Sequence, residues 1–215
     1  MSLITRRDAI KATAGFAAGI TLASGAGTVA ASSEDARIDI KPGSWPNSIN
    51  PNANGVIPVA LLEVFNSRIT VQGDAAITGD GIDVLLDEGE HNERTVTVAI
   101  PRFAPLDVFD RNGDGDITTN EAERALTNGL GIPPLRASVE DVDGDGDDDL
   151  IMHFDKEVFF DVVPDVSMND RFDAALIGVI EWPETTPGSD GRRLFDGADE
   201  IRIVGGGRGG GRGRP

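Results

Sequence analysis

The sequence predicts a mainly β protein, an antiparallel β-sandwich, on three observations. Short apolar or alternating segments recur along the chain, as half-buried strands require. Clusters of turn-forming residues separate these segments, and the 27 glycines and 12 prolines supply many of the turns. Only one stretch of the body has a helical pattern. Many short strands with one short helix are typical of two packed antiparallel sheets.

Ten segments are expected to be strands. Val96, Val98 and Ile100 share one face of the clearest strand, because side chains alternate along an extended chain. Pro101 and Pro105 are expected to end it, since proline donates no hydrogen bond to a neighbouring strand. The expected strands are residues 37–40, 56–62, 68–71, 82–86, 94–100, 136–139, 150–154, 158–163, 174–182 and 200–204.

The β-sandwich body, residues 32–204, is expected to contain a loop–helix insertion at about residues 106–130. Residues 120–126 predict the helix, with acidic residues at the start, Ala and Leu within it and Asn128-Gly129 as a stop. Residues 205–215 form a Gly/Arg tail that cannot supply a core, and we expect it to be disordered. Its arginines resemble RNA-binding Gly/Arg repeats, but contact with the acidic body is the simpler reading.

The twelve residues 110–121 carry oxygen ligands in the order that calcium requires. They match the EF-hand pattern of side-chain oxygens at positions 1, 3 and 5, glycine at 6 and an aliphatic residue at 8. Position 7 offers a carbonyl, position 9 a hydroxyl or a water, and position 12 two carboxylate oxygens. The residues are Asp110, Asn112, Asp114, Gly115, Asp116, Ile117, Thr118 and Glu121.

The segment before this loop departs from a complete EF-hand. Pro101 and Pro105 leave room for at most one helical turn, residues 106–109. The unit therefore resembles the loop–helix of dockerins, although Glu121 stands where dockerins usually carry Asp. No second EF-hand follows to form a pair, which disfavours a calcium sensor. We expect an EF-hand/dockerin-like calcium loop–helix inserted in the β framework.

A second acidic loop begins at Asp141 and has no carboxylate at position 12, where Met152 stands. Asp149 at position 9 can take over that role, as in the calcium loops of integrin-type propeller blades, which join two strands. Close carboxylates repel each other, and a divalent cation reverses that sign. A solvated acidic hairpin is the alternative. The expected ligands are Asp141, Asp143, Asp145, the carbonyl of Asp147, and Asp149.

The charge balance and the N-terminus point to an exported protein of halophilic type. The chain has 37 acidic and 19 basic residues, a formal net charge of −18, and only three lysines. Such a surface resembles that of proteins from extreme halophiles, and it disfavours nucleic acid as a partner. Residues 1–31 resemble a twin-arginine signal peptide around Arg6-Arg7, with a buried N-terminal helix as the alternative. No segment is apolar for long enough to be a transmembrane helix.

Three blocks resemble a module of exported archaeal and bacterial proteins of unknown function. They are residues 38–60, which begin Ile-Asp-Ile-Lys-Pro-Gly-Ser, residues 137–154 around Glu-Asp-Val-Asp-Gly-Asp-Gly, and residues 195–204. The resemblance implies a β-rich sandwich with an acidic loop in its second half. It implies no catalytic residue, and residues 63–134 match poorly. The aspartates carried over are Asp141, Asp143, Asp145 and Asp149.

The sequence thus predicts calcium-ion binding by a secreted or cell-envelope protein that calcium stabilises. An alternative is a calcium-dependent carbohydrate-binding or adhesive envelope module, in which Trp45 stacks on a sugar. For Trp45 and Trp182, packing in the core or in a loop is the simpler expectation. His91 and His153 are expected to be structural. We expect no enzyme: the chain has no cysteine, and no nucleophile or acid/base pair stands out for a hydrolase.

Overall fold

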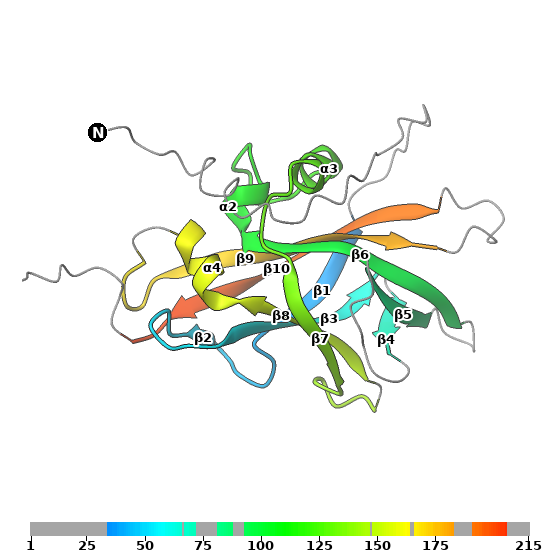
Figure 1. Ribbon diagram of the computed structural model, residues 1–215, viewed down its shortest axis with the longest axis horizontal. Helices are drawn as coiled ribbons and strands as arrows, with labels where there is room; N and C mark the ends of the chain where they lie inside the picture. Colours follow the sequence, from blue (N-terminus) through cyan, green and yellow to red (C-terminus); the bar gives the residue numbers. More distant parts are fainter. Residues whose placement is uncertain are drawn as a thin grey trace, which may run out of the picture.

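The computed structural model describes residues 34–65, 67–71, 81–87, 93–146, 148–163, 166–182 and 191–205. The expected export signal, His91, Asp147 and the Gly/Arg tail beyond Gly205 lie outside these residues. The described chain is mainly β, as predicted (Figure 1). Its strands are β1 (Glu34–Ile40), β2 (Asn47–Ile49), β3 (Val56–Val64), β4 (Ser67–Thr70), β5 (Gly81–Asp87), β6 (Glu93–Pro105), β7 (Pro134–Glu140), β8 (Asp149–Asp155), β9 (Arg171–Glu181) and β10 (Arg192–Ile203).

Three helices interrupt the strands: α2 (Leu106–Phe109), α3 (Thr119–Thr127) and α4 (Lys156–Val162). The positions of α2 and α3 agree with the expected single turn and the expected helix. The α4 helix overturns the prediction of a strand at residues 158–163. Asp155 caps it, because its Oδ1 accepts the backbone N–H groups of Glu157 (2.8 Å) and Val158 (3.1 Å). A short apolar run fits a strand or a buried helix equally well, and the cap decides.

The strands form one mixed sheet whose hydrogen-bonded path closes on itself. The order is β1-β10-β9-β6-β5-β4-β3, and β3 pairs back to β1. The expectation of a wholly antiparallel sheet is wrong for β1 and β2, which both run parallel to β10. Residues 41–46 carry the chain along one edge of β10 without reversing it. The division into two packed sheets stays a prediction.

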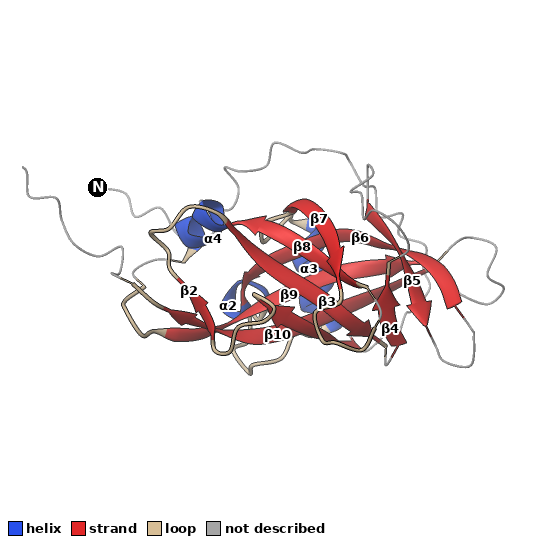
Figure 2. Cartoon of the chain, turned by 90° about the horizontal axis from the view of Figure 1, so that it is seen from below, coloured by secondary structure: helices blue, strands red, loops and turns tan. Residues whose placement is uncertain are grey.

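The sheet forks at β3. Residues 56–61 of β3 pair with β8, whereas Glu63 and Val64 pair with β4 on the same side. Beyond β8 lies β7, and just before β7 the backbone of Ile132 exchanges two hydrogen bonds with Phe103 of β6. The space between β3 and β6 is thus filled by β4 and β5 at one end and by β8 and β7 at the other. In Figure 2, β7 and β8 lie near the middle of the molecule, and β4 and β5 lie toward its right-hand end.

The long strand β6 continues past Pro101, which was expected to end it, and stops at Pro105, as expected for the second proline. Its pairing with β9 shifts between Ala99 and Arg102, and Ile100 has a positive φ of 43°. Pro101 therefore lies within an irregularity of the ladder, where its missing N–H costs no strand hydrogen bond. The continuation allows Phe103 to reach Ile132.

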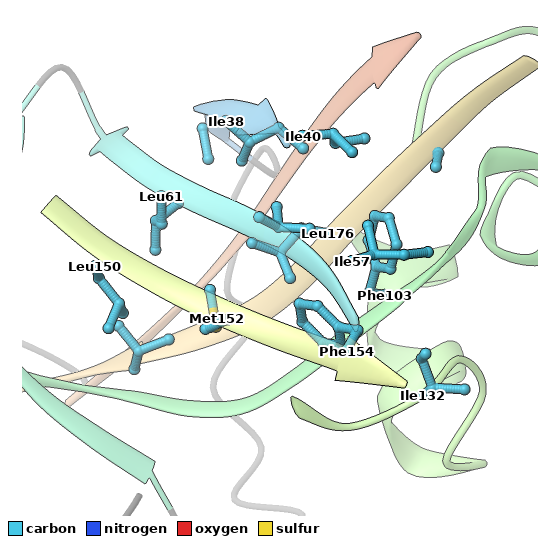
Figure 3. Packing of buried hydrophobic residues seen from close by; sticks show 14 of the residues in the cluster. Ile38, Ile40, Ile57, Leu61, Phe103, Ile132, Leu150, Met152, Phe154 and Leu176 are labelled. Atoms are coloured by element: carbon cyan, nitrogen blue, oxygen red, sulfur yellow. The ribbon is translucent and has the colours of Figure 1, made fainter. Parts of the chain in front are cut away.

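The main core fills the inside of the closed sheet. Side chains from β1, β3, β8 and β9 converge there, including Ile38, Leu61, Met152 and Leu176 (Figure 3). The ring centroids of Phe103 and Phe154 lie 4.9 Å apart, and the ring of Phe159 of α4 stacks on that of Phe103 at the same distance. A second cluster lies on the outer face, where α2 and α3 cover Ala104 of β6 and two residues of β9. The β9 residues are Ala175 and Ile177.

Candidate metal centres in two acidic loops

The first acidic loop connects α2 to α3 on the outer face of β6 and β9. Ile117 anchors it and is only 4% exposed, because it packs in the cluster formed by α2, α3 and β9. Asp110 and Glu121, the two ends of the predicted ligand set, are also buried. The aliphatic residue at position 8 of the calcium-loop pattern therefore points inward.

Backbone amides of the first loop converge on the carboxylate of Asp110. Its Oδ1 accepts the N–H of Gly113 (2.6 Å), and its Oδ2 accepts the N–H of Gly115 (2.9 Å). Both glycines have positive φ, 77° and 97°, which a side chain would make costly. The side-chain oxygen of Asn112 accepts the N–H of Asp114 at 2.8 Å. The loop is thus wound around the side chains at positions 1 and 3.

Four donors occupy the Glu121 carboxylate. Oε1 accepts the backbone N–H groups of Arg111 (2.8 Å) and Asn112 (3.2 Å). Oε2 accepts the hydroxyl (2.8 Å) and the N–H (3.1 Å) of Thr118, and the second of these bonds is the carboxylate half of a capping box with Thr118 as the N-cap residue. The Thr118 hydroxyl, together with the backbone donors, lowers the pKa of Glu121. A carboxylate offers about four lone-pair positions, so these donors use its whole capacity.

The second acidic loop, between β7 and β8, repeats the backbone of the first. Oδ1 of Asp141 accepts the N–H of Gly144 (2.7 Å), and Oδ2 accepts the N–H of Gly146 (3.1 Å). The two glycines have φ values of 79° and 96°, close to those at the same positions of the first loop. Oδ1 of Asp143 accepts the N–H of Asp145 at 3.3 Å. Positions 1 to 6 therefore adopt one conformation in both loops.

Asp149 closes the second loop from the first residue of β8. Its Oδ2 accepts the N–H of Val142 at position 2 (3.0 Å), the same backbone position whose N–H Glu121 accepts in the first loop. Asp149 is 4% exposed, and this burial, reinforced by nearby loop aspartates, raises its pKa to about 6. A carboxylate at position 9 of a strand-bounded loop thus reaches the place of a position-12 glutamate on a helix.

Three carboxylates of the second loop meet. Oxygens of Asp141, Asp143 and Asp149 lie within 4.8 Å of one another. Throughout the part of the chain that the structure describes, no other three carboxylate or imidazole groups come so close together. The first loop, all of it described, has no such group of three carboxylates, and its position 3 is Asn112 where the second loop has Asp143. A group of three oxygens at this spacing can hold a hard divalent cation such as calcium.

Two arginines from distant strands contact the second loop. Arg37 of β1 lies 2.7 Å from Oδ2 of Asp143, and Arg68 of β4 lies 2.9 Å from Oδ2 of Asp145. The backbone N–H of Val71 also donates to the carbonyl of Asp148 (3.0 Å). The loop is therefore attached to β1 and β4 at the fork of the sheet. Sequence reasoning missed both arginines, and no local signal marks them, since Arg37 and Asp143 are 106 residues apart.

The other predicted ligands lie at the loop surface. Asp114, Asp116 and Thr118 are exposed, and Oδ1 of Asp114 accepts the N–H of Asp116 (3.1 Å). Asp145 is exposed and paired with Arg68. Asp147 lies outside the described residues, so its predicted carbonyl ligand stays a prediction.

The prediction that both tryptophans pack against the protein is confirmed for one of them and wrong for the other. Trp182 packs as expected, with its ring 5.7 Å from that of Phe65. The packing prediction is wrong for Trp45, which is 81% exposed on the loop between β1 and β2. His153 contacts the Ser138 hydroxyl at 2.7 Å, and burial and Arg136 lower its pKa. We assign no catalytic role to it.

The described helices are all too short to cross a membrane. Comparison of the chain with protein-family models, with curated protein sequences and with solved structures finds no match. The two loops and the sheet that carries them are therefore the whole basis for assigning a function.

Proposed function

We propose that this protein binds calcium ions and is an exported, calcium-stabilised β protein. The observation that carries the proposal is the convergence of the Asp141, Asp143 and Asp149 carboxylates within 4.8 Å. Carboxylates this close repel one another, and burial of Asp149 increases the cost of its charge. A calcium ion supplies the missing positive charge and accepts six to eight oxygens, so one oxygen from each of the three carboxylates fills only part of its coordination shell.

The first loop supports the same function as an EF-hand/dockerin-like loop–helix. It has a complete set of ligand types, and its backbone from Asp110 to Gly115 matches that of the second loop. Glu121 must exchange some of its four protein donors for calcium when the ion binds. We propose that this unit is inserted into a β-sandwich and that the two sites act independently. In Figure 1 they lie on opposite sides of the sheet.

The role of calcium is structural in this proposal. The second loop joins β1, β4, β7 and β8 at the fork, and the first holds α2 and α3 on the outer face. Ions at these places tie together segments that are distant in sequence. The predicted export signal places the protein where extracellular calcium sites work, with dissociation constants of roughly 10⁻⁴–10⁻³ M.

Titration calorimetry in high-salt buffer tests the proposal. We expect two calcium-binding events in the unaltered protein, one event after Asp110→Ala or Asp141→Ala, and none after both. Asp170→Ala is the matched control, because Asp170 also accepts a backbone N–H in a surface turn (Ser167, 2.6 Å) but lies outside both loops. An unaltered protein that gives no calcium heat overturns the proposal.

The exposure of Trp45 favours a second candidate, a calcium-dependent carbohydrate-binding or adhesive module. An 81% exposed tryptophan offers a flat apolar face on which a sugar ring can stack. A glycan screen with and without calcium tests this candidate. Binding lost in Trp45→Ala but kept in Leu135→Ala, which alters another exposed apolar residue (59%), supports it. Binding that survives Trp45→Ala removes Trp45 from the interaction.

A further inference from the structure

Arg37 lies between two carboxylates, and only one of them belongs to the second acidic loop. Its Nη2 is 2.7 Å from Oδ2 of Asp143 and 3.2 Å from Oε1 of Glu63. Arg37 and Glu63 are partners in the β1–β3 ladder, so their contact depends on the sheet and not on the loop. The loop contact is the shorter of the two.

A row of alternating charge continues across the sheet beneath the loop. Glu63 of β3 is the ladder partner of Arg37 on one side and of Arg68 on the other. Each arginine reaches up to one loop carboxylate, Asp143 or Asp145. The sheet thus presents two cations to the loop and keeps one anion, Glu63, between them.

We propose that Arg37 is the internal counter-cation of the second loop, which calcium displaces from Asp143 onto Glu63. The inference rests on the proposed calcium site and adds a determinant of its affinity. Without calcium, the guanidinium neutralises part of the charge of the loop and holds Asp143 near Asp141 and Asp149. When calcium binds, the Asp143 carboxylate turns to the ion, and Arg37 keeps Glu63 as a partner without any movement of β1 or β3.

The inference makes Arg37 a competitor of calcium. A divalent ion and a guanidinium a few ångströms apart repel even in water, so loss of the arginine charge favours the ion. Salt weakens this repulsion, because the Debye length falls from about 10 Å at 0.1 M to about 3 Å at 1 M. Glu63 has the opposite effect, since it gives the displaced guanidinium an alternative partner.

Calcium titration in a Glu121→Gln background, which disables the first loop, tests the inference. We expect Arg37→Gln to tighten binding by about threefold to tenfold at 0.1 M NaCl and by less at 1 M. Glu63→Gln should weaken binding, and this effect should shrink to less than about half when Arg37→Gln is also present. Arg171→Gln is the matched control, because Arg171 forms an equally short pair with Glu200 (2.7 Å) and is equally exposed, but lies far along the sheet.

Arg37→Lys tests whether the charge of Arg37 or the shape of its guanidinium group sets the calcium affinity. It also provides a second variant if Arg37→Gln does not fold. It keeps the positive charge, so calcium affinity should stay within about twofold of the parent. Circular dichroism checks the folding of each variant. If the parent binds no calcium at the second loop, the proposed function fails there. If the parent binds but Arg37→Gln binds equally or more weakly, the inference about Arg37 is wrong and the calcium site stands.

Discussion

The two acidic loops share one backbone conformation but differ in how many protein hydrogen bonds the closing carboxylate accepts. The first loop has the more complete motif, yet its Glu121 is saturated by donors from Arg111, Asn112 and Thr118. The second loop lacks a ligand at position 12, yet its Asp149 accepts one backbone N–H from the described residues, that of Val142, and stands close to two other carboxylates. The loop with the more complete sequence motif is therefore not the one in which three carboxylates meet, because Asn112 stands where the second loop has Asp143.

The difference comes from the element that follows each loop. A helix exposes free N–H groups in its first turn, and a glutamate at the third helical position naturally satisfies the capping residue, here Thr118. A strand offers no such donors, so Asp149 reaches the loop with its charge only partly satisfied. The comparison teaches that the ligand types and the donors competing for them have to be considered together.

The largest expected difference concerns the apolar anchors of the two loops. Ile117→Ala should lower the free energy of unfolding by about 2–5 kcal/mol, since it leaves a cavity in a buried cluster. Val142→Ala should cost only about 1 kcal/mol, because Val142 is partly exposed over Ala60, Leu62 and Ile151. Urea denaturation in high-salt buffer measures both values. Equal losses would mean that the loops are attached to the sheet with equal strength.

The next effect concerns the closing carboxylates. Glu121→Gln and Asp149→Asn should each weaken calcium binding at their own loop by at least about 100-fold, since even outer-shell changes cost 10–100-fold. We expect the site that remains after Glu121→Gln to be the tighter one, because calcium need not displace four protein hydrogen bonds there. Calorimetry on the two single variants gives the two affinities. If the first loop, which is the site that remains after Asp149→Asn, binds calcium more tightly than the second, this account of the two closing carboxylates is wrong.

The smallest expected effect is on the stability of the calcium-free protein, to which Asp149 and Glu121 contribute with opposite pH dependence. The pKa of Asp149 is raised to about 6 from an ordinary 3.8, so the folded state holds its proton more tightly and stability from this group falls as the pH rises from about 4 to 6. The pKa of Glu121 is lowered from 4.5, so its contribution is present above that value and is lost as the pH falls through the lower folded pKa. Denaturation in EDTA across this range measures both trends.

Two variants separate these contributions. At pH 7.5 without calcium, Asp149→Asn should raise the unfolding free energy by about 1 kcal/mol, after allowance for solvent screening. It should also flatten the profile between pH 4 and 6. Glu121→Gln should lower stability at pH 7.5 and flatten the profile below about 4.5. A stabilising Glu121→Gln would contradict the account of a saturated carboxylate.

The sequence by itself determined the local features of this protein. The spacing of Asp110 to Glu121 and of Asp141 to Asp149 predicts loops whose hydrogen bonds form within a dozen residues. The alternation along β6 and the short apolar segments of β3 and β8 predict strands. The single turn of α2 and the helix α3 follow from prolines, caps and stops in the same short range. These features depend on neighbours in the chain, so the amino-acid order is sufficient to specify them.

Only the tertiary structure decided the rest. The closure of β3 onto β1, the parallel pairing of β10 and the fork at β3 depend on which strands meet, and alternation does not encode partners. Residues 158–163 became a helix because Asp155 capped them and the core received Phe159 and Phe160. Arg37 reaches Asp143 of the second loop, and Glu63 lies beside Arg37, because the closed sheet brings β1 and β3 beneath the loop. The proposed metal ligands are a local property of the sequence, whereas the charges proposed to compete with the metal are a property of the fold.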